Sequence, residues 1–457
     1  MTNGELGSLA LALMLVIGMA NLMGHLFLRM RQPKIVGEIL AGILIGPMVL
    51  GRLHISVADL FGANGSRSAA VLACFYNLGL LLLMFVSGSA ARRLLAKENR
   101  RPTAWLLACG TALPFLLALG LAKSLPLHAV AGPNGVPTSV ALVFGIAVSV
   151  TSIPVISHIF NSLDIMNTRF AAVVLGVAVL EDILLWAVLA FATALSVGSV
   201  NGALASTISV HVGTTIAYLA TGLILMPGVL RYLSRSRWNV VAQNSPIGWI
   251  MTVLFAYVGV AGVLDVTPAF AGFLAGFGIA GGMKASERAR FAEPLDMISK
   301  ISFATFIPVY TALVGYRLDF TKEFSLLMLV SFLVGSSLVR LASAGLASHL
   351  AGFRGRDNVN LAITSNARGG PGIVLASVAL DAGIINAPFF TSLVVTAVLT
   401  SQLAGWWLGY TLRRGLPLLS DSDLRRRGTT LEGILSEDAN PVHAGSVVVA
   451  ARSDHRA

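Results

Sequence analysis

The amino-acid sequence predicts an all-α polytopic membrane protein. Of its 457 residues, 56% are hydrophobic and only 12% are charged, and the mean hydropathy is strongly positive. Soluble globular domains carry about 25% charged residues, so this composition excludes them. Apolar stretches of about 20 residues recur from Leu9 to Leu412, and each can cross a hydrocarbon core of roughly 30 Å as a helix. They lack the period-2 alternation of membrane-spanning strands, which leaves helices as the predicted element.

Clusters of charged residues, proline and glycine divide the apolar sequence into thirteen candidate transmembrane helices. In chain order they are predicted at residues 8–28, 34–50, 69–90, 103–123, 138–160, 169–196, 205–230, 246–263, 266–282, 295–317, 324–350, 358–381 and 387–411. We expect the first to be a retained helix and not a removable signal, because no basic region precedes it. Residues 1–412 are thus predicted to form a transmembrane domain, and the polar tail at 413–457 is predicted to be disordered.

The positive charges predict how the chain crosses the membrane. Loops that follow odd-numbered helices carry seventeen Lys and Arg residues, whereas even-numbered loops and helix ends carry five. Cytoplasmic loops are enriched in these residues, so we expect the N-terminus outside the cell membrane and the C-terminus in the cytoplasm. This distribution also accounts for the net charge of +11. Because the basic residues form no patch with interleaved aromatics, no nucleic-acid partner is expected.

Cys74 and Cys109 are the two cysteines, and they lie in separate apolar stretches. They offer neither a disulfide framework nor the spacing of a metal site. His25, His158 and His211 are likewise isolated from other potential metal ligands. We therefore expect no cofactor, and no Gly-x-Gly-x-x-Gly motif in the tail indicates a nucleotide-binding domain.

Two matches at the same spacing predict that the chain consists of two related halves. Residues 41–46 (Ala-Gly-Ile-Leu-Ile-Gly) resemble residues 271–276 (Ala-Gly-Phe-Leu-Ala-Gly), seven helices later. The same step joins the fifth helix, interrupted between Thr151 and Pro154, to the twelfth, interrupted at Gly369, Gly370 and Pro371. Because seven is odd, matched helices run in opposite directions, which gives an inverted repeat with paired broken helices. The alternative is a chance match, since small residues are common in membrane helices.

Glu181 and Asp182 stand side by side inside the sixth apolar stretch. One charged side chain near the centre of a bilayer costs roughly 2.5 to 3.5 kcal/mol on insertion scales, so the pair predicts a functional site. At a rise of about 1.5 Å per residue, Asp182 and Thr151 both fall near the midplane. Pro154 lacks an N–H and frees backbone carbonyls, which with the Thr151 and Ser152 hydroxyls and the Asp182 carboxylate would form an oxygen-rich cage for a monovalent cation. The same cage can hold a proton instead, so the two ions compete.

Three cations also lie within predicted helices, and each could neutralise a carboxylate: Lys300, Arg340 and Arg368. Lys300 is near the cytoplasmic end of its helix, where it could instead extend its ammonium group to the membrane surface. Arg340 is deeper, and we expect it to have an internal partner or to hold the ends of the broken helices. Arg368 adjoins the Gly369 break, where free carbonyls attract a positive charge. We expect Glu38 to stabilise the N-terminus of its helix rather than to bind the ion.

These motifs resemble those of the monovalent cation:proton antiporters, which exchange Na⁺ or K⁺ for protons. The resemblance covers about residues 8–411 and is most specific at Val36 to Pro47, Thr151 to Pro154, Glu181-Asp182, Ala269 to Gly276, Pro308 to Gly315 and Asn366 to Gly369. It implies a homodimer with interleaved dimerisation and core subdomains, in which two broken helices cross at the midplane and access alternates by an elevator-like movement. It also implies that Asp182 is the essential ion-binding residue.

The position before that aspartate varies within the family. The resemblance implies Asp there in electrogenic exchangers, Asn in many electroneutral ones and Gln in the Kef-type potassium systems. Glu181 is acidic but one methylene longer than Asp, so it resembles the electrogenic pattern without matching it. In two further departures, the family's basic residue on the tenth helix would fall nearer Phe303 than Lys300, and no Kef-type cytoplasmic domain is found.

We therefore predict a secondary antiporter in the lipid bilayer that exchanges Na⁺ or K⁺ for protons by alternating access, electrogenically. The alternative is a passive monovalent cation channel on the same fold. An intramembrane hydrolase that uses the acidic pair is disfavoured, because neighbouring helical side chains point about 100° apart and do not readily share a catalytic proton. The protein is not expected to be an enzyme.

Overall fold

A computed structural model of the chain describes residues 2–30, 32–46, 49, 67–94, 105–163, 165, 168–200, 205–281, 285–318, 320 and 324–419. Across these ranges the regular structure is helical, apart from one isolated bridge between Ala131 and Ile385. Nine helices of the described part are long and apolar enough to cross a membrane, and two shorter apolar helices accompany them. The all-α polytopic fold is therefore confirmed, whereas the count of thirteen helices stays a prediction. Pro47 and the predicted tail from residue 420 onward lie outside the described residues.

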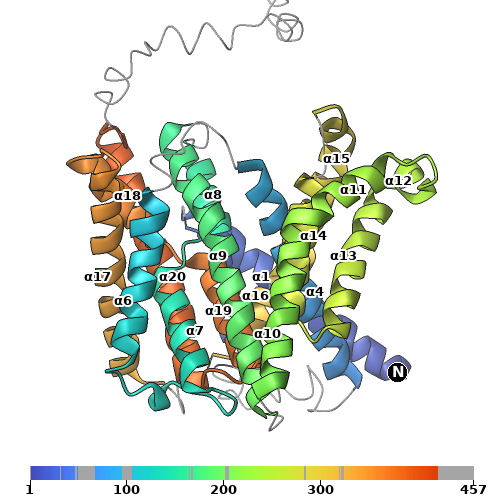
Figure 1. Ribbon diagram of the computed structural model, residues 1–457, viewed down its shortest axis with the longest axis horizontal. Coiled ribbons are helices and arrows are strands. Elements are labelled where there is room, and N and C mark those ends of the chain that lie inside the picture. The colour runs from blue at the N-terminus through green and yellow to red at the C-terminus, as the bar shows by residue number, and fades with distance from the viewer. Residues whose placement is uncertain are drawn as a thin grey trace, which may run out of the picture.

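The helices form two groups that lie side by side in Figure 1. The α14 group consists of α1 (Asn3–Arg29), α2 (Lys34–Ile45), α4 (Arg67–Leu94), α12 (Val240–Asn244), α13 (Pro246–Val263), α14 (Pro268–Gly281), α15 (Ala285–Ile301) and α16 (Ile307–Tyr316). The α9 group consists of α6 (Leu113–Ala122), α7 (Pro137–Ser149), α8 (Ile153–Ser162), α9 (Arg169–Val200), α17 (Leu326–Leu350), α18 (Arg356–Ser365), α19 (Gly369–Asp381) and α20 (Ala387–Arg413). Between them, α10 (Ala205–Ala220) contacts α9 and α11 (Met226–Arg235) contacts α14.

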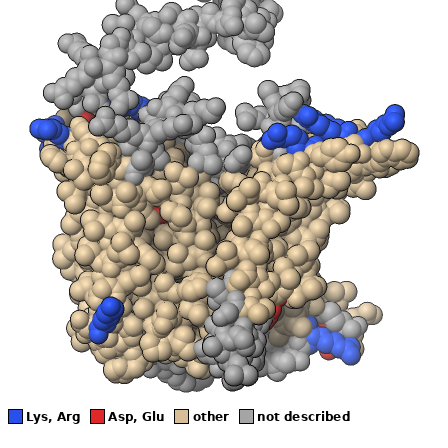
Figure 2. All heavy atoms as spheres, viewed as in Figure 1, with Lys and Arg blue, Asp and Glu red and all other residues tan. Residues whose placement is uncertain are grey.

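The charged residues follow the pattern expected of a membrane protein. On the face shown in Figure 2, the middle of the molecule is almost free of charge, and Lys and Arg gather at the rim above α11 and α12. Large apolar side chains are exposed on neighbouring segments, for example Ile224 (81%) just before α11 and Val263 (87%) at the end of α13. Such a surface is stable against lipid, because lipid tails replace the water that would oppose its exposure.

Wide π-helical turns interrupt three of the spans, and each lies two residues before a proline. These turns are η3 (Ala108–Ala112), η5 (Thr221–Leu225) and η6 (Ser302–Phe306), followed by Pro114, Pro227 and Pro308. Proline has no N–H and its ring clashes with the carbonyl four residues earlier, so the chain widens there instead of breaking. One carbonyl per turn then needs a donor from elsewhere.

Side chains from other helices supply that donor at two of the three turns. The carbonyl four residues before Pro114 belongs to Gly110, and the Nη1 atom of Arg340 donates to it. In the same way, Nδ2 of Asn21 donates to the carbonyl of Ala304 at 3.0 Å. The prolines therefore create acceptors inside the membrane that fix a partner helix.

Glycines allow two pairs of helices to approach backbone to backbone. Between α2 and α16, a Cβ added to Gly42 would lie 1.8 Å from the carbonyl oxygen of Ala312. One added to Gly315 would lie 2.1 Å from the carbonyl oxygen of Ile39. Real atoms do not approach so closely, so any larger residue at either glycine would push these two helices apart.

The contact between α4 and α14 repeats this geometry. A Cβ on Gly276 would lie 2.0 Å from the oxygen of Phe85, and one on Gly88 would lie 2.0 Å from the oxygen of Phe273. In both pairs of helices the spacing is the same: Gly315 faces Ile39, three residues before Gly42, and Gly88 faces Phe273, three residues before Gly276. By contacts, then, the counterpart of Gly42 is Gly276.

This pairing corrects the register of the predicted repeat. The alignment of residues 41–46 with residues 271–276 makes Gly272 the counterpart of Gly42. The observed contacts shift that equivalence by four residues, one helical turn. Gly42 and Gly276 also lie equally far, eight residues, from the first residues of α2 and α14.

Two helix interruptions meet near the middle of the α9 group. Helix α7 ends at Ser149 and α8 begins at Ile153, while α18 ends at Ser365 and α19 begins at Gly369. The N–H of Ser152 donates to the carbonyl of Ala367 at 2.8 Å, which joins the two interruptions directly. Gly369 has a φ of +37°, a backbone conformation that residues with a side chain rarely adopt.

The prolines of these segments lie inside helices rather than at the interruptions. Pro154 is the second residue of α8 and Pro371 the third of α19, where a missing N–H leaves no helical hydrogen bond unmade. A helix continuous from α7 through α8 would need an N–H at position 154 to bond the carbonyl four residues earlier, and Pro154 has none, which helps to separate the two helices.

A polar cluster joins the two helix groups at the ends of α16 and α19. Nη1 of Arg317 lies 2.7 Å from Oδ1 of Asp381, and the hydroxyl of Tyr76 donates to Oδ2 of that aspartate at 3.2 Å. The Arg317 guanidinium also lies over the Tyr76 ring, 4.5 Å from its centroid. Beside it, Tyr310 donates to the Ser377 hydroxyl at 3.3 Å.

Candidate functional site

Glu181 and Asp182 are both fully buried in α9, with exposed fractions of 0% and 1%. Because successive residues of a helix point in different directions, the two carboxylates face different surroundings. Glu181 has a charged partner, whereas Asp182 has none among the described residues. The adjacent acids are therefore not equivalent.

Glu181 is held by an arginine from another helix. Its Oε1 atom lies 2.7 Å from Nη2 of Arg340, and both side chains are buried. The hydroxyl of Thr151 donates to the same oxygen at 3.1 Å. A buried ion pair requires such additional hydrogen bonds, because the attraction between the charges alone does not offset the loss of hydration.

Arg340 connects four parts of the α9 group through its guanidinium. Besides Glu181 it contacts the hydroxyl of Thr151, and it donates from Nη1 to Gly110 O. Its Nε donates to the carbonyl of Ser365 at 3.1 Å, and Ser365 is the last residue of α18. A helix C-terminus carries a partial negative charge, so the arginine neutralises it as well as the carboxylate. Arg340 thus holds one end of a broken helix and compensates Glu181.

Asp182 faces a small apolar cavity of about 10 Å³ and is the only charged residue among the described ones that line it. Both of its carboxylate oxygens are buried and lack a hydrogen-bond partner in the described part of the chain. The cavity is lined by Ile146, Val150, Asp182, Leu185, Trp186, Leu189, Pro371 and Leu375. It therefore lies at the C-terminal end of α7, where the carbonyls after that of Ile146 have no N–H partner within the helix.

The predicted cage of Thr151, Ser152 and Asp182 is wrong in its contacts. Thr151 turns toward Glu181 and donates to the carbonyl of Ser365 at 2.8 Å. The Ser152 hydroxyl accepts from the N–H of Val155 at 3.2 Å and so caps α8. Both side chains complete the helix interruption, and neither is hydrogen-bonded to Asp182. Serine and threonine favour such local bonds to backbone groups at helix starts.

With this geometry established, comparison with known proteins gives a family. The family model for the transmembrane sodium/hydrogen exchangers matches residues 11–414. The chain belongs to the sodium/hydrogen exchanger family. The predicted resemblance to monovalent cation:proton antiporters is thereby confirmed.

Similar proteins from distant organisms agree with this assignment. The Na(+)/H(+)-K(+) antiporter GerN of Bacillus cereus is 25% identical over 404 residues, covering 87% of this chain and 94% of its own length. The K(+)/H(+) antiporter 1 of Saccharomyces cerevisiae is 27% identical over 405 residues, 85% of this chain but 44% of the yeast protein. The chain thus spans less than half of that yeast relative. The solved structure of the sodium proton antiporter MjNhaP1 from Methanocaldococcus jannaschii superposes with a TM-score of 0.63 at 16% identity, covering 89% of this chain and 97% of that one.

Of the two positions predicted for Lys300 in this exchanger-family chain, the structure agrees with the one at the surface and not with compensation of Glu181. Its ammonium group is exposed and lies 2.7 Å from Oδ2 of Asp296, one helical turn earlier in α15. It has no contact with Glu181, whose charge Arg340 compensates. The i,i+4 spacing of Asp296 and Lys300 was the sequence signal for this surface pair.

Arg368 lies at the second interruption, as predicted, but makes no ion pair in the described part of the chain. Its guanidinium is buried 5.4 Å from the centroid of the Phe332 ring, and none of its three nitrogens has a hydrogen-bond partner there. The N-terminus of α19 is satisfied from α20 instead. The N–H of Gly369 donates to the Ser401 hydroxyl at 3.0 Å, and that of Arg368 to Thr400 at 3.5 Å. Thr400 and Ser401, two hydroxyl residues inside the apolar helix α20, are the sequence signal for this contact.

Glu38 does not cap the N-terminus of α2, contrary to expectation. It is the fifth residue of that helix, lies 3.2 Å from Nζ of Lys34, and accepts from the Thr311 hydroxyl at 2.8 Å. Lys34 also donates to Asn21 Oδ1 and to the carbonyl of Phe303, each at 3.0 Å. The acid is therefore part of a polar contact between α1, α2 and α16.

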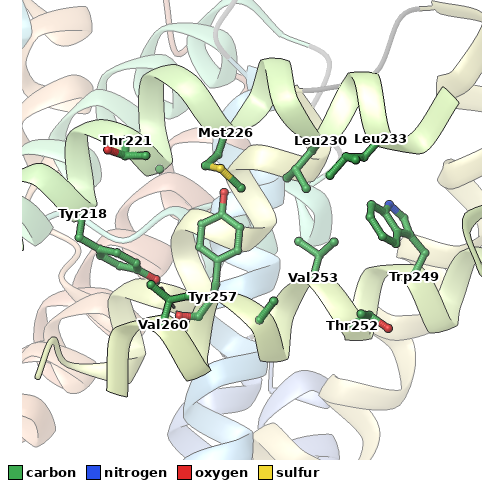
Figure 3. A pocket seen from close by; sticks show the side chains of 12 residues that line it. Tyr218, Thr221, Met226, Leu230, Leu233, Trp249, Thr252, Val253, Tyr257 and Val260 are labelled. Atoms are coloured by element: carbon green, nitrogen blue, oxygen red, sulfur yellow. Dashed lines mark hydrogen bonds between the residues drawn. The ribbon is translucent and has the colours of Figure 1, made fainter. Parts of the chain in front are cut away.

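A larger pocket lies away from the carboxylates, between α11 and α13 (Figure 3). Its volume is about 290 Å³, and aliphatic and aromatic side chains line most of it. The Tyr218 hydroxyl donates to the carbonyl of Tyr257 at 2.9 Å across the groove. In the part of the chain that the structure describes, no charged side chain lines this pocket. Among the described residues, moreover, no three His, Cys, Asp or Glu side chains group as metal ligands would.

Proposed function

We propose that the protein is a secondary antiporter that exchanges Na⁺ or K⁺ for protons at Asp182. The observation that carries this proposal is the isolation of that carboxylate, which is buried, without a partner in the described part, and next to the end of an interrupted helix. An ionised carboxylate in such a place is stable only with a cation beside it, and otherwise takes up a proton. One site that holds either ion, but not both, couples their movements.

Membership of the sodium/hydrogen exchanger family and the names of the similar proteins support the same ions. Those names include both Na⁺ and K⁺, so they leave the cation open. The passive channel is less favoured, because conduction needs a continuous polar path and the cavity at Asp182 is small and apolar. A transporter of this family also gives no reason to expect enzymatic activity.

The protein moves, in this proposal, as two bodies. The α14 group would form the dimerisation subdomain of a homodimer in the cell membrane, and the α9 group would carry Asp182 across by alternating access. Thirteen membrane-spanning helices in an inverted repeat, with the N-terminus outside, would place the two interruptions near the midplane. The repeated glycine contacts of α2 with α16 and of α14 with α4 support that symmetry, because the seven-helix step relates one pair to the other.

The number of protons exchanged depends on Glu181. Its carboxylate is engaged by Arg340 and Thr151, so only Asp182 is free to change its occupant. We infer an exchange of one proton for one cation while that ion pair persists. Electrogenic exchange, expected from the two adjacent acids, requires Glu181 to leave Arg340 during the cycle.

Reconstituted vesicles test the proposed site. A pH gradient should collapse when Na⁺ or K⁺ is added to vesicles with the wild-type protein, and should persist with Asp182→Asn. Asp296→Asn is the matched control, because that carboxylate is exposed in α15 and pairs only with Lys300. Cation-driven collapse that is undiminished in Asp182→Asn would exclude Asp182 as the exchange site.

A further inference from the structure

Trp186 follows Asp182 by four residues, so both side chains lie on the same side of α9. Both line the cavity of about 10 Å³, in which Trp186 is the largest side chain. The indole is almost completely buried, with 6% of its surface exposed. The volume left beside the carboxylate is therefore limited mainly by this ring.

The ring is held from the other helix group. It packs edge to face against Phe270 of α14, with the centroids 6.1 Å apart and the planes at 62°. Phe270 itself is buried, with 1% of its surface exposed. Two turns farther along α9, Thr193 and Thr267 lie 3.5 Å apart and continue the contact between the groups. Trp186 cannot turn away from Asp182 without losing this aromatic partner.

A cavity of this size holds about one water molecule at most, since roughly 10 to 15 Å³ is the lower limit. A cation must therefore reach Asp182 with most of its hydration shell removed, and its size decides whether it fits. The face of an indole is also the best aromatic surface for a cation.

We propose that Trp186 sets the cation selectivity of the site by limiting its size, so that Na⁺ and Li⁺ are accepted in preference to K⁺ and Rb⁺. This inference rests on the proposed exchange at Asp182. Trp186 is a specificity-determining residue that acts from the wall of the site. Its contact with Phe270 keeps the limit in place while the two helix groups are in this arrangement.

Exchange rates with Li⁺, Na⁺, K⁺ and Rb⁺ in reconstituted vesicles test this role. The wild type should have a half-saturating concentration for K⁺ about tenfold or more above that for Na⁺. Trp186→Leu opens the cavity and should reduce that ratio about fivefold or more, and Trp186→Phe should shift it less in the same direction. Leu184→Ala is the control on the same helix, because Leu184 is 49% exposed and lies outside the cavity lining; its ratio should match the wild type.

Two results would overturn the inference: a wild type without preference for the smaller cations, or a K⁺ to Na⁺ ratio that Trp186→Phe leaves unchanged. If Trp186→Leu does not fold, Trp186→Phe decides the question alone. A failure of the proposed function would give a different result. Exchange would then survive in Asp182→Asn, whatever the ratio of the half-saturating K⁺ and Na⁺ concentrations. An equal loss of rate for all four cations in both Trp186 variants would assign the ring to folding and reject its role in selectivity.

Discussion

Removing Arg340 should destabilise the protein more than removing any single group that it contacts. Arg340→Met keeps most of the side-chain length but leaves Glu181 as a buried carboxylate beside the Thr151 hydroxyl, with no charged partner among the described residues. Breaking a buried ion pair from one side costs about 3 to 5 kcal/mol. The carbonyl of Gly110 loses its side-chain donor at the same time, which adds about 1 to 3 kcal/mol when no water replaces it, whereas the carbonyl of Ser365 keeps the Thr151 hydroxyl as a donor. We therefore expect at least about 3 kcal/mol for this single change.

The double variant separates the charge from the hydrogen bonds. In Arg340→Met with Glu181→Leu the uncompensated charge is gone, so the double variant should be more stable than Arg340→Met by about 1 to 4 kcal/mol. Unfolding of the purified protein in detergent micelles, followed in wild type, both single variants and the double variant, gives the coupling energy between the two residues. Thr151→Val is the comparison that removes a hydroxyl bonded to both charged groups but leaves the ion pair itself in place, and it should cost about 1.5 to 3 kcal/mol.

The refuting result is a double variant whose loss of stability equals the sum of the two single losses. That result would mean that Arg340 and Glu181 contribute independently. The inference of one exchangeable carboxylate would then lose its basis, because Glu181 would be as free as Asp182 to bind a proton.

Further predictions concern the helix contacts, the ion competition and the cluster between the groups. Gly42→Ala should destabilise the protein by about 1 to 3 kcal/mol in thermal unfolding, because the added Cβ would meet a backbone oxygen of α16. Gly18→Ala is the control, because the space around Gly18 is open, and it should not destabilise the protein. Equal effects of the two substitutions would contradict the close approach of α2 and α16. If one proton leaves Asp182 for each cation bound, lowering the pH by one unit should raise the half-saturating Na⁺ concentration up to about tenfold at acidic pH. If that concentration instead rises with about the square of the proton concentration, a second carboxylate takes part. Asp381→Asn should change the free energy of unfolding by less than about 1 kcal/mol, because the ion pair of Asp381 with Arg317 is partly exposed. It should also raise the maximal exchange rate, by less than about fivefold, because it loosens the contact between the two helix groups. A lower exchange rate at unchanged stability would contradict this prediction.

Composition and periodicity predicted the part of the fold that depends on the membrane itself. A helix is the only regular element that satisfies its own backbone in lipid, so apolar runs read directly as helices. The interruptions near Ser152 and Arg368 could also be located, because proline and glycine are incompatible with a continuous helix there. What the sequence could not supply was the rotation of α9 about its axis. A turn of about 100° decides whether Glu181 or Asp182 meets Arg340, and that angle follows from contacts with six other helices of the described part rather than from local residues.

The misses at the site have local causes. Thr151 and Ser152 were assigned to an ion cage because they are oxygen donors at the right depth, yet bonds within the interruption satisfy them first. Lys300 was considered as a partner for Glu181 although Asp296 offers an ammonium group a partner one turn away at the surface, without the cost of burial.

The proline turn in the fourth span ties two distant positions of the sequence together. Pro114 leaves the carbonyl of Gly110 without a helical donor, and Arg340 donates to it from more than 200 residues away. With alanine at 114, the helix could close its own bond to Gly110, and the arginine would lose one of its anchors. A residue that looks like a local helix defect therefore sets the orientation of a charge at the centre of the site. Among related exchangers, a proline at the position of Pro114 and an arginine at the position of Arg340 should therefore occur together or be absent together.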